Sequence, residues 1–283
     1  MKQVSTISDI RSGVAELRAA GKTIAFVPTM GALHEGHLSL MRLAKQKADE
    51  VVVSIYVNPT QFGPNEDFDS YPRQMEKDLK ACEEEGVSVV FTPNDKIMYG
   101  SGERYFGISI DELNEDMDGG SRPSFFEGIA LVVNKLFNII EPDVAVFGQK
   151  DIQQFQILSR MVEEFNHDIE LVAAPIARAN DGLALSSRNA YLSDKERKIA
   201  PGLYRALQYV EKQIRDGVDE PKLLLKHQQD ELEAKGFKND YLNVFSMDNM
   251  QPVQKLEPGT TYILAGAAYL GKTRLIDNII LDL

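Results

Sequence analysis

Residues 23–57 have the sequence TIAFVPTMGALHEGHLSLMRLAKQKADEVVVSIYV, and this stretch decides the fold class. The apolar run at 23–27 predicts a strand, and the turn residues at 28–31 end it. Apolar residues at helical spacing predict a helix over 37–48. The nearly continuous β-branched run at 51–57 is typical of a strand buried in a parallel sheet. The stretch is therefore predicted to form one βαβ unit.

The same alternation of strand and helix continues to about residue 176. It predicts an α/β fold with a Rossmann-like parallel sheet and helices on both faces. Ligands of such sheets bind beyond the carboxyl ends of the strands, so the loops there are the candidate sites. The further strands are expected at 87–91, 144–147 and 169–174, and the further helices at 74–85, 127–140 and 151–165.

The pattern changes after residue 176, where helices are followed by strands. Two helices are expected, at 193–217 and 220–234, and then strands at 241–247, 260–270 and 276–281. This order predicts a smaller C-terminal α+β domain. We therefore expect a nucleotide- and substrate-binding domain over 1–176 and a C-terminal lid domain over 177–283.

Composition excludes several classes of protein. The chain has 283 residues with 31 Lys and Arg against 43 Asp and Glu, a formal net charge of −12. Such a balance lacks the basic surface of a duplex-binding protein. No apolar run approaches the roughly 20 residues of a membrane helix, and the beginning of the chain has no apolar signal-peptide core. A single cysteine, Cys82, excludes an internal disulfide. We expect a cytoplasmic protein.

The strongest local motif is H-x-G-H, formed by His34 and His37 between the first expected strand and its helix. Spacing of three at a helix start puts both imidazoles on one side. We expect free backbone N–H groups there to attract phosphate. Gly31 and Gly36 leave room for a nucleotide against the backbone. The motif indicates nucleotidyl transfer, although a helix cap with two surface histidines has the same letters.

Three further motifs lie in loops. They are LSSRN at 185–189, GQKDIQQ at 148–154 and NPTQFGP at 58–64. The first two combine hydroxyl groups or a carboxylate with a cation, which suits a phosphate chain. The third offers uncharged hydrogen-bonding groups for a small polar substrate. Each motif alone is also consistent with an ordinary cap, turn or loop.

One match is misleading. Residues 266–273, GAAYLGKT, fit the letters of the phosphate-binding pattern G-x-x-x-x-G-K-[ST]. Their apolar centre continues a strand-like run, and only ten residues follow Thr273, too few for a supporting nucleotide fold. We predict a strand and a turn. Cys82, in a charged helical stretch without a partner motif, is predicted to be a non-catalytic thiol.

Taken together and in this order, the motifs resemble the family of pantoate–β-alanine ligases, also called pantothenate synthetases. The resemblance spans the whole chain and includes PTMGALHEGH, NPTQF, YPR at 71–73, KDxQQ and SSRN. It implies condensation of (R)-pantoate with β-alanine, driven by ATP, to give pantothenate, AMP and diphosphate through pantoyl adenylate. It also implies Mg²⁺ with ATP, no tightly bound organic cofactor, and a cytoplasmic homodimer joined through the N-terminal domain, without nucleic-acid or membrane partners.

The resemblance assigns roles residue by residue. His37, as proton donor, with His34, Lys150 and Arg188 would be catalytic. The ATP-binding set would be Met30, Gly31, Ala32, Leu33, His34, Glu35, Gly36, His37, Gly148, Gln149, Lys150, Asp151, Ala177, Leu185, Ser186, Ser187 and Arg188. Pantoate would meet Gln61, Gln154, Met30, Asn58 and Arg122, and β-alanine would meet Gln61 and Tyr71. No protein ligand of a metal is assigned, because Mg²⁺ is expected mainly on the ATP phosphates.

This chain departs from the family at a few positions. Many members have a histidine within the stretch that corresponds to 123–128, where this chain has Phe125. Many also have Met at Leu185, Glu at Gln149 and Val at Ala177. We expect these last three changes to be tolerated, because apolar packing or backbone contacts persist.

Three alternatives stay open. The first is another H-x-G-H adenylyltransferase, acting on phosphopantetheine or a mononucleotide, although those lack the paired glutamine motifs. The second is a regulator that binds ATP without releasing pyrophosphate. The third is a relative of the tRNA-charging enzymes, which the acidic balance and the lack of a tRNA-binding extension disfavour.

Overall fold

The computed structural model covers the whole chain and describes residues 1–64, 66, 68–102, 105–122 and 124–283. The chain forms two compact units. Unit 1 comprises residues 1–110, 123–148 and 154–175, and unit 2 comprises 111–122, 149–153 and 176–283. Two short segments that precede residue 176, 111–122 and 149–153, therefore cluster with the C-terminal part.

Unit 1 is built on a parallel sheet, as the sequence predicts. Among the described residues, six strands pair in the order β1-β4-β3-β2-β5-β6, and every pairing is parallel. Their bounds are β1 Lys2–Val4, β2 Ile24–Thr29, β3 Glu50–Ile55, β4 Val89–Phe91, β5 Val144–Gly148 and β6 Glu170–Ala174. The central strands are buried on both faces, which explains their continuous apolar sequences.

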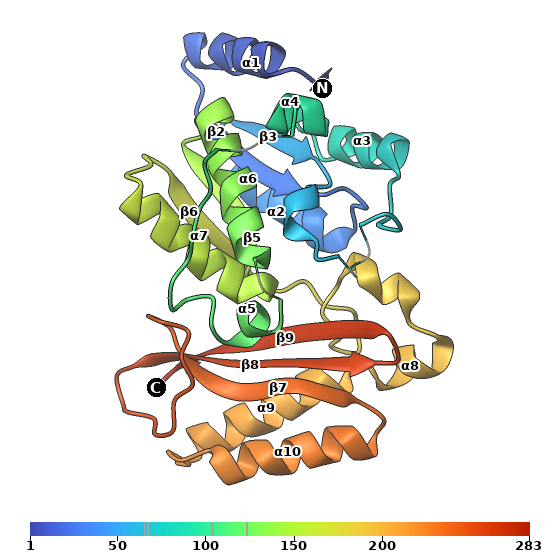
Figure 1. Ribbon diagram of the computed structural model, residues 1–283, viewed down its shortest axis with the longest axis vertical. Coiled ribbons are helices and arrows are strands. Elements are labelled where there is room, and N and C mark those ends of the chain that lie inside the picture. Colours follow the sequence, from blue (N-terminus) through green and yellow to red (C-terminus); the bar gives the residue numbers. More distant parts are fainter. Residues whose placement is uncertain (65, 67, 103–104, 123) are drawn as a thin grey trace. The chain divides into compact units, whose positions relative to one another are not determined.

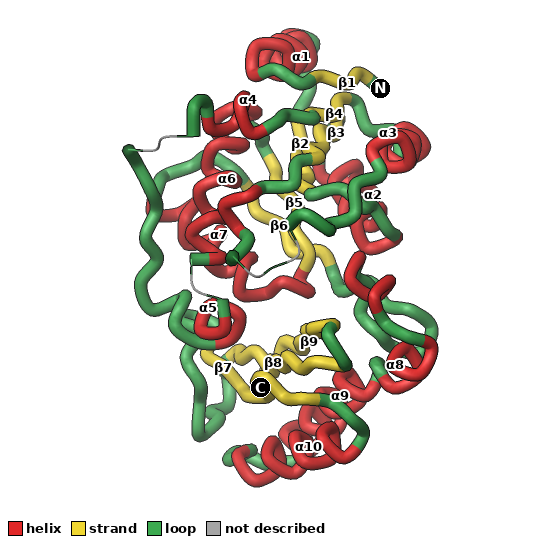
Figure 2. The backbone as a smooth tube through the Cα atoms, turned by 45° about the vertical axis from the view of Figure 1, so that its right-hand side comes forward, coloured by secondary structure: helices red, strands yellow, loops and turns green. Residues whose placement is uncertain are grey.

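Helices cover both faces of this sheet (Figures 1 and 2). One face packs on α2 and α3 through residues such as Met41 and Cys82. On the other face, the ring of Phe137 in α6 lies 6.5 Å from Phe26 and 6.4 Å from Phe147, measured between centroids. The helices of unit 1 are α1 Ile7–Ala19, α2 Glu35–Lys47, α3 Met75–Glu84, α4 Asp95–Tyr99, α6 Phe125–Ile140 and, from Gln154 onward, α7 Ile152–Glu164. The single turn η1 Pro59–Gln61 also belongs to this unit.

The N-terminal pair β1 and α1 was not anticipated from the sequence. Helix α1 begins at a cap, where Thr6 Oγ1 accepts a hydrogen bond from the Asp9 N–H at 3.2 Å. Its buried residues include Ile10 and Val14, so only a narrow stripe of the helix is apolar. A short edge strand and a helix with few core residues give weak periodic signals.

Unit 2 is α+β, also as predicted. An antiparallel sheet of β7 Lys238–Ser246, β8 Thr261–Leu270 and β9 Thr273–Asp282 packs one face on α9 Gly202–Arg215 and α10 Lys222–Ala234. The other face of the sheet is covered by α5 Met117–Ser121 and η2 Gln149–Asp151, two short elements of this unit. The remaining elements are η3 Ser187–Tyr191 and α8 Asp194–Ile199.

The helix expected at 193–217 is two helices. Helix α8 ends at Ile199 and α9 begins at Gly202. Pro201 stands between them, and a proline has no N–H to continue the hydrogen-bond ladder of a helix. The capping box of Ser193 and Glu196 starts α8 where the sequence predicts a helix start.

The misleading phosphate-binding pattern is a β-hairpin. Strand β8 ends at Leu270, Gly271 and Lys272 make the turn, and Thr273 opens β9. Gly271 has φ of +56°, and a Cβ there would lie 2.1 Å from Glu196 Oε1, so the glycine serves the turn. The prediction of a strand and a turn is confirmed.

Cys82 lies inside the core beside α2 and is fully buried. Burial raises the pKa of its thiol to about 12. A thiol with so high a pKa stays protonated near neutral pH and is a poor nucleophile. This supports the non-catalytic role that the sequence predicts.

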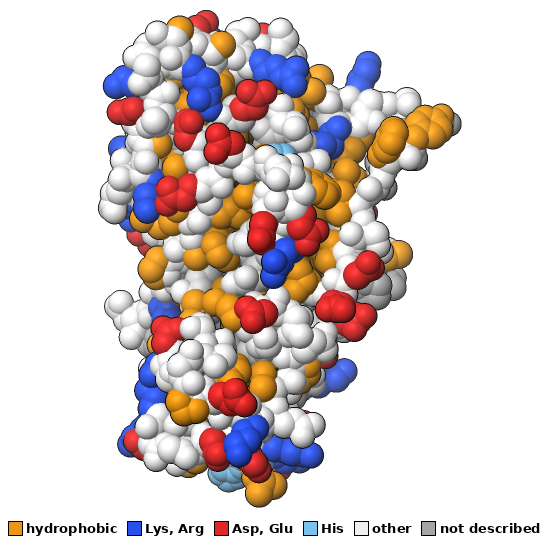
Figure 3. Space-filling view, turned by 90° about the vertical axis from the view of Figure 1, so that its left-hand side faces the viewer, with side chains coloured by type: hydrophobic (Ala, Val, Ile, Leu, Met, Phe, Trp, Pro, Cys, Tyr) orange, Lys and Arg blue, Asp and Glu red, His pale blue; other side chains and the backbone are white. Residues whose placement is uncertain are grey.

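On the face drawn in Figure 3, acidic and basic side chains lie interspersed with apolar ones. Within the described ranges, no helix has both the length and the apolar character needed to span a membrane.

Candidate active site

The turn after β2 is shaped by a glycine. Gly31 has φ of +82°, a conformation that other residues rarely adopt. Its N–H donates to Thr29 Oγ1 at 3.2 Å. A Cβ on Gly31 would lie 2.9 Å from Asp78 Oδ2 and 3.1 Å from Ile55 Cγ2. The turn is therefore closed to larger residues at this position.

A buried carboxylate from α3 fixes the same turn. Asp78 is 2% exposed, and its two oxygens accept the N–H groups of Ala32 at 3.0 Å and Leu33 at 2.9 Å. Gln74 Nε2 adds a third hydrogen bond at 3.3 Å. The sequence analysis missed Asp78, because it is 41 residues from His37 and stands in a stretch that looks like a solvated helix. It holds the backbone from which both histidines follow.

His34 and His37 cap α2 through their ring nitrogens. His34 Nδ1 accepts the N–H of Gly36 at 3.1 Å, and His37 Nδ1 accepts the N–H of His34 at 3.4 Å. The two rings lie 4.2 Å apart between centroids. Since each Nδ1 accepts a hydrogen bond, a neutral ring carries its proton on Nε2. Each imidazole therefore presents an Nε2–H donor.

The expectation of free backbone N–H groups at this helix start was wrong for most of these groups. Asp78 takes those of Ala32 and Leu33. The imidazoles take those of His34 and Gly36, and the carbonyl of His34 accepts those of His37 and Leu38 at 2.8 and 3.1 Å. The imidazole Nε2–H groups are the side-chain donors of this turn that suit an anion.

Three residues assigned to pantoate meet next to this turn. Asn58 Nδ2 donates to Gln61 Oε1 at 3.0 Å, and Gln61 Nε2 donates to Met30 Sδ at 3.0 Å. These bonds fix the orientation of the Gln61 amide, with its nitrogen toward Met30. A thioether is a weak acceptor. An oxygen of a bound substrate would be a better partner for Gln61 Nε2.

A second layer holds Asn58, which is 1% exposed. Tyr99 OH donates to Asn58 Oδ1 at 2.6 Å, and Thr60 Oγ1 donates to it at 3.0 Å. Helix α6 comes so close that a Cβ on Gly128 would lie 2.1 Å from the Thr60 carbonyl oxygen. Tyr99 is the last residue of α4 and Gly128 lies in α6, both far along the chain from Asn58, and no local pattern marks them.

The loop that follows Gln61 carries Tyr71 in an aromatic cluster. The ring of Tyr71 packs edge-on against Phe62, with centroids 5.9 Å apart. Arg73 donates to the carbonyl oxygens of Tyr71, Asp69 and Phe68 at 3.2, 3.3 and 3.1 Å. In the YPR motif, the arginine therefore shapes the loop and the tyrosine is 6% exposed.

The other assigned residues divide between the units. Gln154, half-buried in the first turn of α7, and Gly148, at the end of β5, belong to unit 1, whereas Arg122 belongs to unit 2 as the C-cap of α5. Phe125 begins α6, with its ring 4.8 Å from that of Phe126. Pro123, in the stretch where the family often has a histidine, lies outside the described residues.

In unit 2, Lys150 and Asp151 stand side by side in η2, with Nζ and Oδ1 3.5 Å apart. The Lys150 side chain is 20% exposed. The next residues are held firmly: Gln153 is 2% exposed and accepts the N–H groups of Asp118 and Gly119. Its amide nitrogen donates to the carbonyl oxygens of Leu113 and Asp116. Of the neighbouring glutamines Gln153 and Gln154, Gln153 therefore has a structural role, because it holds the backbone of residues 113–119.

Residues 177–188 form a small hairpin followed by a cap. The N–H of Leu185 donates to the carbonyl oxygen of Ala177 at 2.9 Å, which brings two residues assigned to ATP together. Ser186 Oγ accepts the N–H of Arg188 at 3.3 Å and starts η3, which contains Ser187. The hydroxyl and guanidinium groups of the SSRN motif thus emerge from one short turn.

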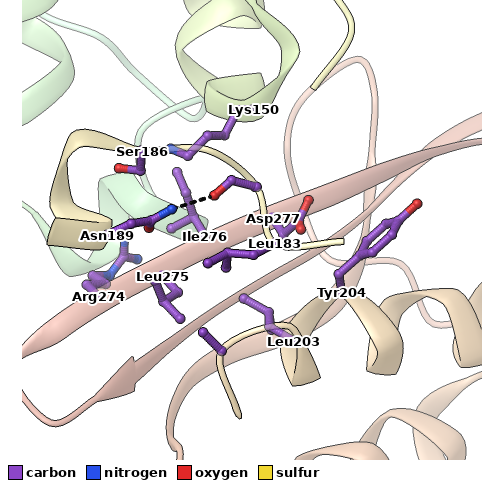
Figure 4. Close-up of a pocket in the computed structure, with 12 residues that line it drawn as sticks. Lys150, Leu183, Ser186, Asn189, Leu203, Tyr204, Arg274, Leu275, Ile276 and Asp277 are labelled. Carbon is purple, nitrogen blue, oxygen red and sulfur yellow. Dashed lines mark hydrogen bonds between the residues drawn. The ribbon is translucent and has the colours of Figure 1, made fainter. Parts of the chain in front are cut away.

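A small cavity of about 20 Å³ lies between this turn, α9 and β9 (Figure 4). Its lining includes Lys150, Ser186, Asn189 and Asp277. A space of this size holds one water molecule and is too small for a nucleotide. It shows how closely the Lys150 segment and the SSRN turn approach each other within unit 2.

The donor set fits a magnesium–polyphosphate complex better than a bare metal ion. Within the part of the chain that is described, no group of three His, Cys, Asp or Glu side chains is arranged to hold a metal. Imidazole N–H, lysine and arginine groups suit phosphate oxygens. Mg²⁺ commonly keeps several waters and binds through substrate phosphates.

Comparisons with known proteins agree on one family. The family profile described as Pantoate-beta-alanine ligase matches residues 2–280. The chain is 47% identical to the pantothenate synthetase of Pseudomonas fluorescens over 100% of this chain and 99% of the relative. It is also 47% identical to that of Carboxydothermus hydrogenoformans, again over 100% and 99%.

Solved structures give the same result. A pantothenate synthetase from Thermus thermophilus superposes with a TM-score of 0.90 at 38% identity, covering 99% of both chains. The pantoate–β-alanine ligase from Francisella tularensis, complexed with beta-gamma ATP and β-alanine, superposes with a TM-score of 0.82 at 35% identity. That match covers 99% of this chain and 97% of the other.

Proposed function

The chain belongs to the pantoate–β-alanine ligase family, and from this premise we propose that it condenses (R)-pantoate with β-alanine at the expense of ATP. The observation that carries the proposal is the family match over nearly the whole chain, together with two imidazoles held as Nε2–H donors beside the Met30–Gln61–Asn58 group. These two sets of side chains suit a phosphate and a small polar acid.

In the first step a carboxylate oxygen of pantoate attacks the α-phosphorus of ATP. A P–O bond forms, the bond between the α- and β-phosphoryl groups breaks, and pyrophosphate leaves. No protein nucleophile is needed, because the substrate is already an anion. His34 and His37 donate hydrogen bonds to phosphate oxygens, and His37 is the proton donor that the resemblance implies. Lys150 and Arg188 offset the charge that develops on the departing pyrophosphate.

In the second step the amine of β-alanine attacks the acyl carbon of pantoyl adenylate. A C–N bond forms, the C–O bond to AMP breaks, and the amine loses a proton. Gln61 serves both substrates in this proposal, as the resemblance implies. Its amide nitrogen faces Met30, and its oxygen is held by Asn58. An acyl adenylate hydrolyses readily in water, so a lid domain over 177–283 would have a physical purpose.

Mg²⁺ belongs to the proposal as the partner of ATP, where it would neutralise phosphate charge. Asp151 is the carboxylate nearest to Lys150 in η2 and is half-exposed. The remaining assignments are also proposed from the resemblance: pantoate at Gln154 and Arg122, β-alanine at Tyr71, a homodimer joined through the N-terminal domain, and a cytoplasmic location.

The deciding experiment measures pyrophosphate release from Mg-ATP with (R)-pantoate, with and without β-alanine. We expect limited release with pantoate alone and catalytic release once β-alanine is added. Binding of ATP without any pantoate-dependent release would favour an ATP-sensing regulator. Release that depends on another acceptor would favour a different H-x-G-H adenylyltransferase.

A further inference from the structure

Two consecutive polar residues are buried in β9. Asp277 is 5% exposed and Asn278 is 2% exposed. Successive side chains of a strand point to opposite faces of the sheet. One of the two therefore faces the side of α9 and the other faces the side of η2. Buried polar side chains are hydrogen-bonded in the great majority of cases. The hydrogen-bond partners of Asp277 and Asn278 therefore show which segment each side chain holds.

The side-chain amide of Asn278 hydrogen-bonds to the Lys150 segment through both its nitrogen and its oxygen. Its Nδ2 donates to the carbonyl oxygens of Gln149 and Lys150, both at 3.0 Å. Its Oδ1 accepts from Gln149 Nε2 at 3.2 Å. Asn278 therefore holds the backbone at Gln149 and Lys150, and with it the origin of the Lys150 side chain.

Asp277 holds the hairpin that contains Ala177. Both of its oxygens accept from Arg178, at 2.6 and 2.8 Å, in a bidentate pair. Arg178 also donates to the Gly182 carbonyl oxygen at 3.1 Å and lies 3.5 Å over the ring of Tyr204. A single guanidinium thus ties the hairpin to β9 and to α9.

The two anchors are joined directly, because the N–H of Asn278 donates to Asp277 Oδ1 at 2.8 Å. Figure 4 shows Lys150 and Ser186 on one side of the β9 ribbon, with Leu203 and Tyr204 of α9 on the other. The resemblance assigns to Ala177 backbone contacts with the adenine of ATP. One dipeptide therefore connects the segment assigned to the phosphates with the hairpin that would contact adenine.

We propose that Asp277 and Asn278 are positioning residues for ATP, which fix the spacing between the adenine-contacting hairpin and the phosphate-contacting Lys150 segment. The inference rests on the ATP assignments of the proposed function. Neither residue needs to touch the nucleotide. Asn278 acts through Lys150, and Asp277 acts through Arg178.

The test measures binding of ATP and of its two halves, adenosine and inorganic pyrophosphate, by titration calorimetry. For Asn278→Ala we expect pyrophosphate and ATP to bind about tenfold more weakly, the scale of two lost hydrogen bonds. Adenosine binding should stay within about twofold. For Asp277→Asn we expect the converse, with adenosine weakened and pyrophosphate spared. Arg178→Lys, which keeps the charge and loses the bidentate pair, replaces Asp277→Asn if that variant does not fold.

Asn239→Ala is the matched control. Asn239 lies in the same sheet, and its Nδ2 donates to a backbone carbonyl oxygen, that of Gln229, at 2.8 Å. This variant should lose thermal stability with no change in any of the three affinities. Equal weakening of adenosine and pyrophosphate by Asn278→Ala would overturn the proposal, as would unchanged ATP binding.

The expected split is the selective loss of pyrophosphate binding in one variant and of adenosine binding in the other. It does not depend on pantoate chemistry. If the variants show the split but the wild-type protein releases no pyrophosphate with pantoate, the proposed reaction is refuted and this inference stands. A wild-type protein that binds neither adenosine nor pyrophosphate would refute this inference. The two failures are therefore distinguishable.

Discussion

The turn at Gly31–His37 and the segment at Gln149–Asp151 both carry residues assigned to ATP, yet they are held in different ways. The turn supplies most of its own hydrogen bonds, through Thr29 and the two histidines, and takes one anchor, Asp78, from α3. The Gln149–Asp151 segment is held by Asn278, more than a hundred residues away. The difference teaches that a motif can be complete in its letters while its geometry depends on residues that no motif contains.

Substitution of His37 should have the largest effect. His37→Ala removes both the Nε2–H donor and the cap, and we expect adenylate formation to fall by about 10²-fold or more, the scale of one electrostatic or acid group. Pantoate-dependent pyrophosphate release in a single turnover measures this step. His227→Ala, on the exposed face of α10, is the matched control and should be neutral.

Two more variants separate the donor from the cap. The amide oxygen of Asn replaces Nδ1, and the amide nitrogen of Gln replaces Nε2–H. We expect His37→Asn to be as inactive as the alanine variant but more stable, and His37→Gln to keep part of the activity. Near-normal turnover in His37→Ala would remove the role that we assign.

Asp78→Asn tests the remote anchor of the turn. An amide offers one acceptor to two N–H groups and turns a donor toward the second. We expect the free energy of unfolding to fall by about 1–3 kcal/mol. We also expect kcat to fall by about tenfold or more, because the backbone that positions the two imidazoles is no longer held. Thermal unfolding and steady-state kinetics measure the two effects.

Asp143→Asn provides the comparison for this variant. Asp143 also accepts a backbone N–H in unit 1, that of Ile24 at 2.7 Å. This bond lies at the start of β2, whereas the Gly31 turn follows the end of that strand. It should lose stability and keep kcat. An Asp78→Asn protein with reduced stability and unchanged kcat would show that Asp78 serves the fold alone.

Gln61→Ala asks whether the neighbouring substrate group is separate from the turn. We expect the KM for pantoate to rise about tenfold, the scale of one or two hydrogen bonds to a charged group. The affinity for ATP should change little, because the resemblance assigns Gln61 to pantoate and β-alanine, and its hydrogen bonds join Met30 and Asn58, which it also assigns to pantoate. Equal losses for pantoate and ATP would contradict the assignment of Gln61.

Lys272→Ala should have the smallest effect. Lys272 completes the letters of a phosphate-binding loop, but it is exposed in the turn between β8 and β9. We expect the KM for ATP to stay within about twofold, as for an ordinary surface substitution. Lys150→Ala, measured alongside, should raise it far more. A large effect at Lys272 would reinstate the phosphate-binding interpretation of the hairpin.

Much of the fold could be predicted because its signals are local. The β-branched run of β3 and the strand–turn–helix around His34 need only neighbouring residues to be recognised. The split of the helix at Pro201 was missed because apolar spacing continues across it. Helix α1 was missed because its buried stripe, with Ile10 and Val14, is narrow.

The resemblance assigns the chemistry-bearing residues of the site position by position, and these assignments stay predictions. The residues that support them in the structure could not be predicted. Asp78, Tyr99, Gln153 and Asn278 act through contacts that span about 30 to 130 residues of sequence. The occupied N–H groups at the start of α2 were likewise missed, because only the folded turn reveals that the imidazoles and Asp78 already bind them.

The burial of Cys82 makes the protein convenient for site-specific labelling. The only thiol of the chain lies in the core, and its pKa is raised to about 12. Maleimide dyes react with exposed thiolates, so the natural protein should stay nearly unlabelled while it is folded. A cysteine introduced at an exposed position in each unit would then carry the dyes without removal of Cys82. Energy transfer between those dyes would report the distance between the units as ATP, pantoate and β-alanine are added.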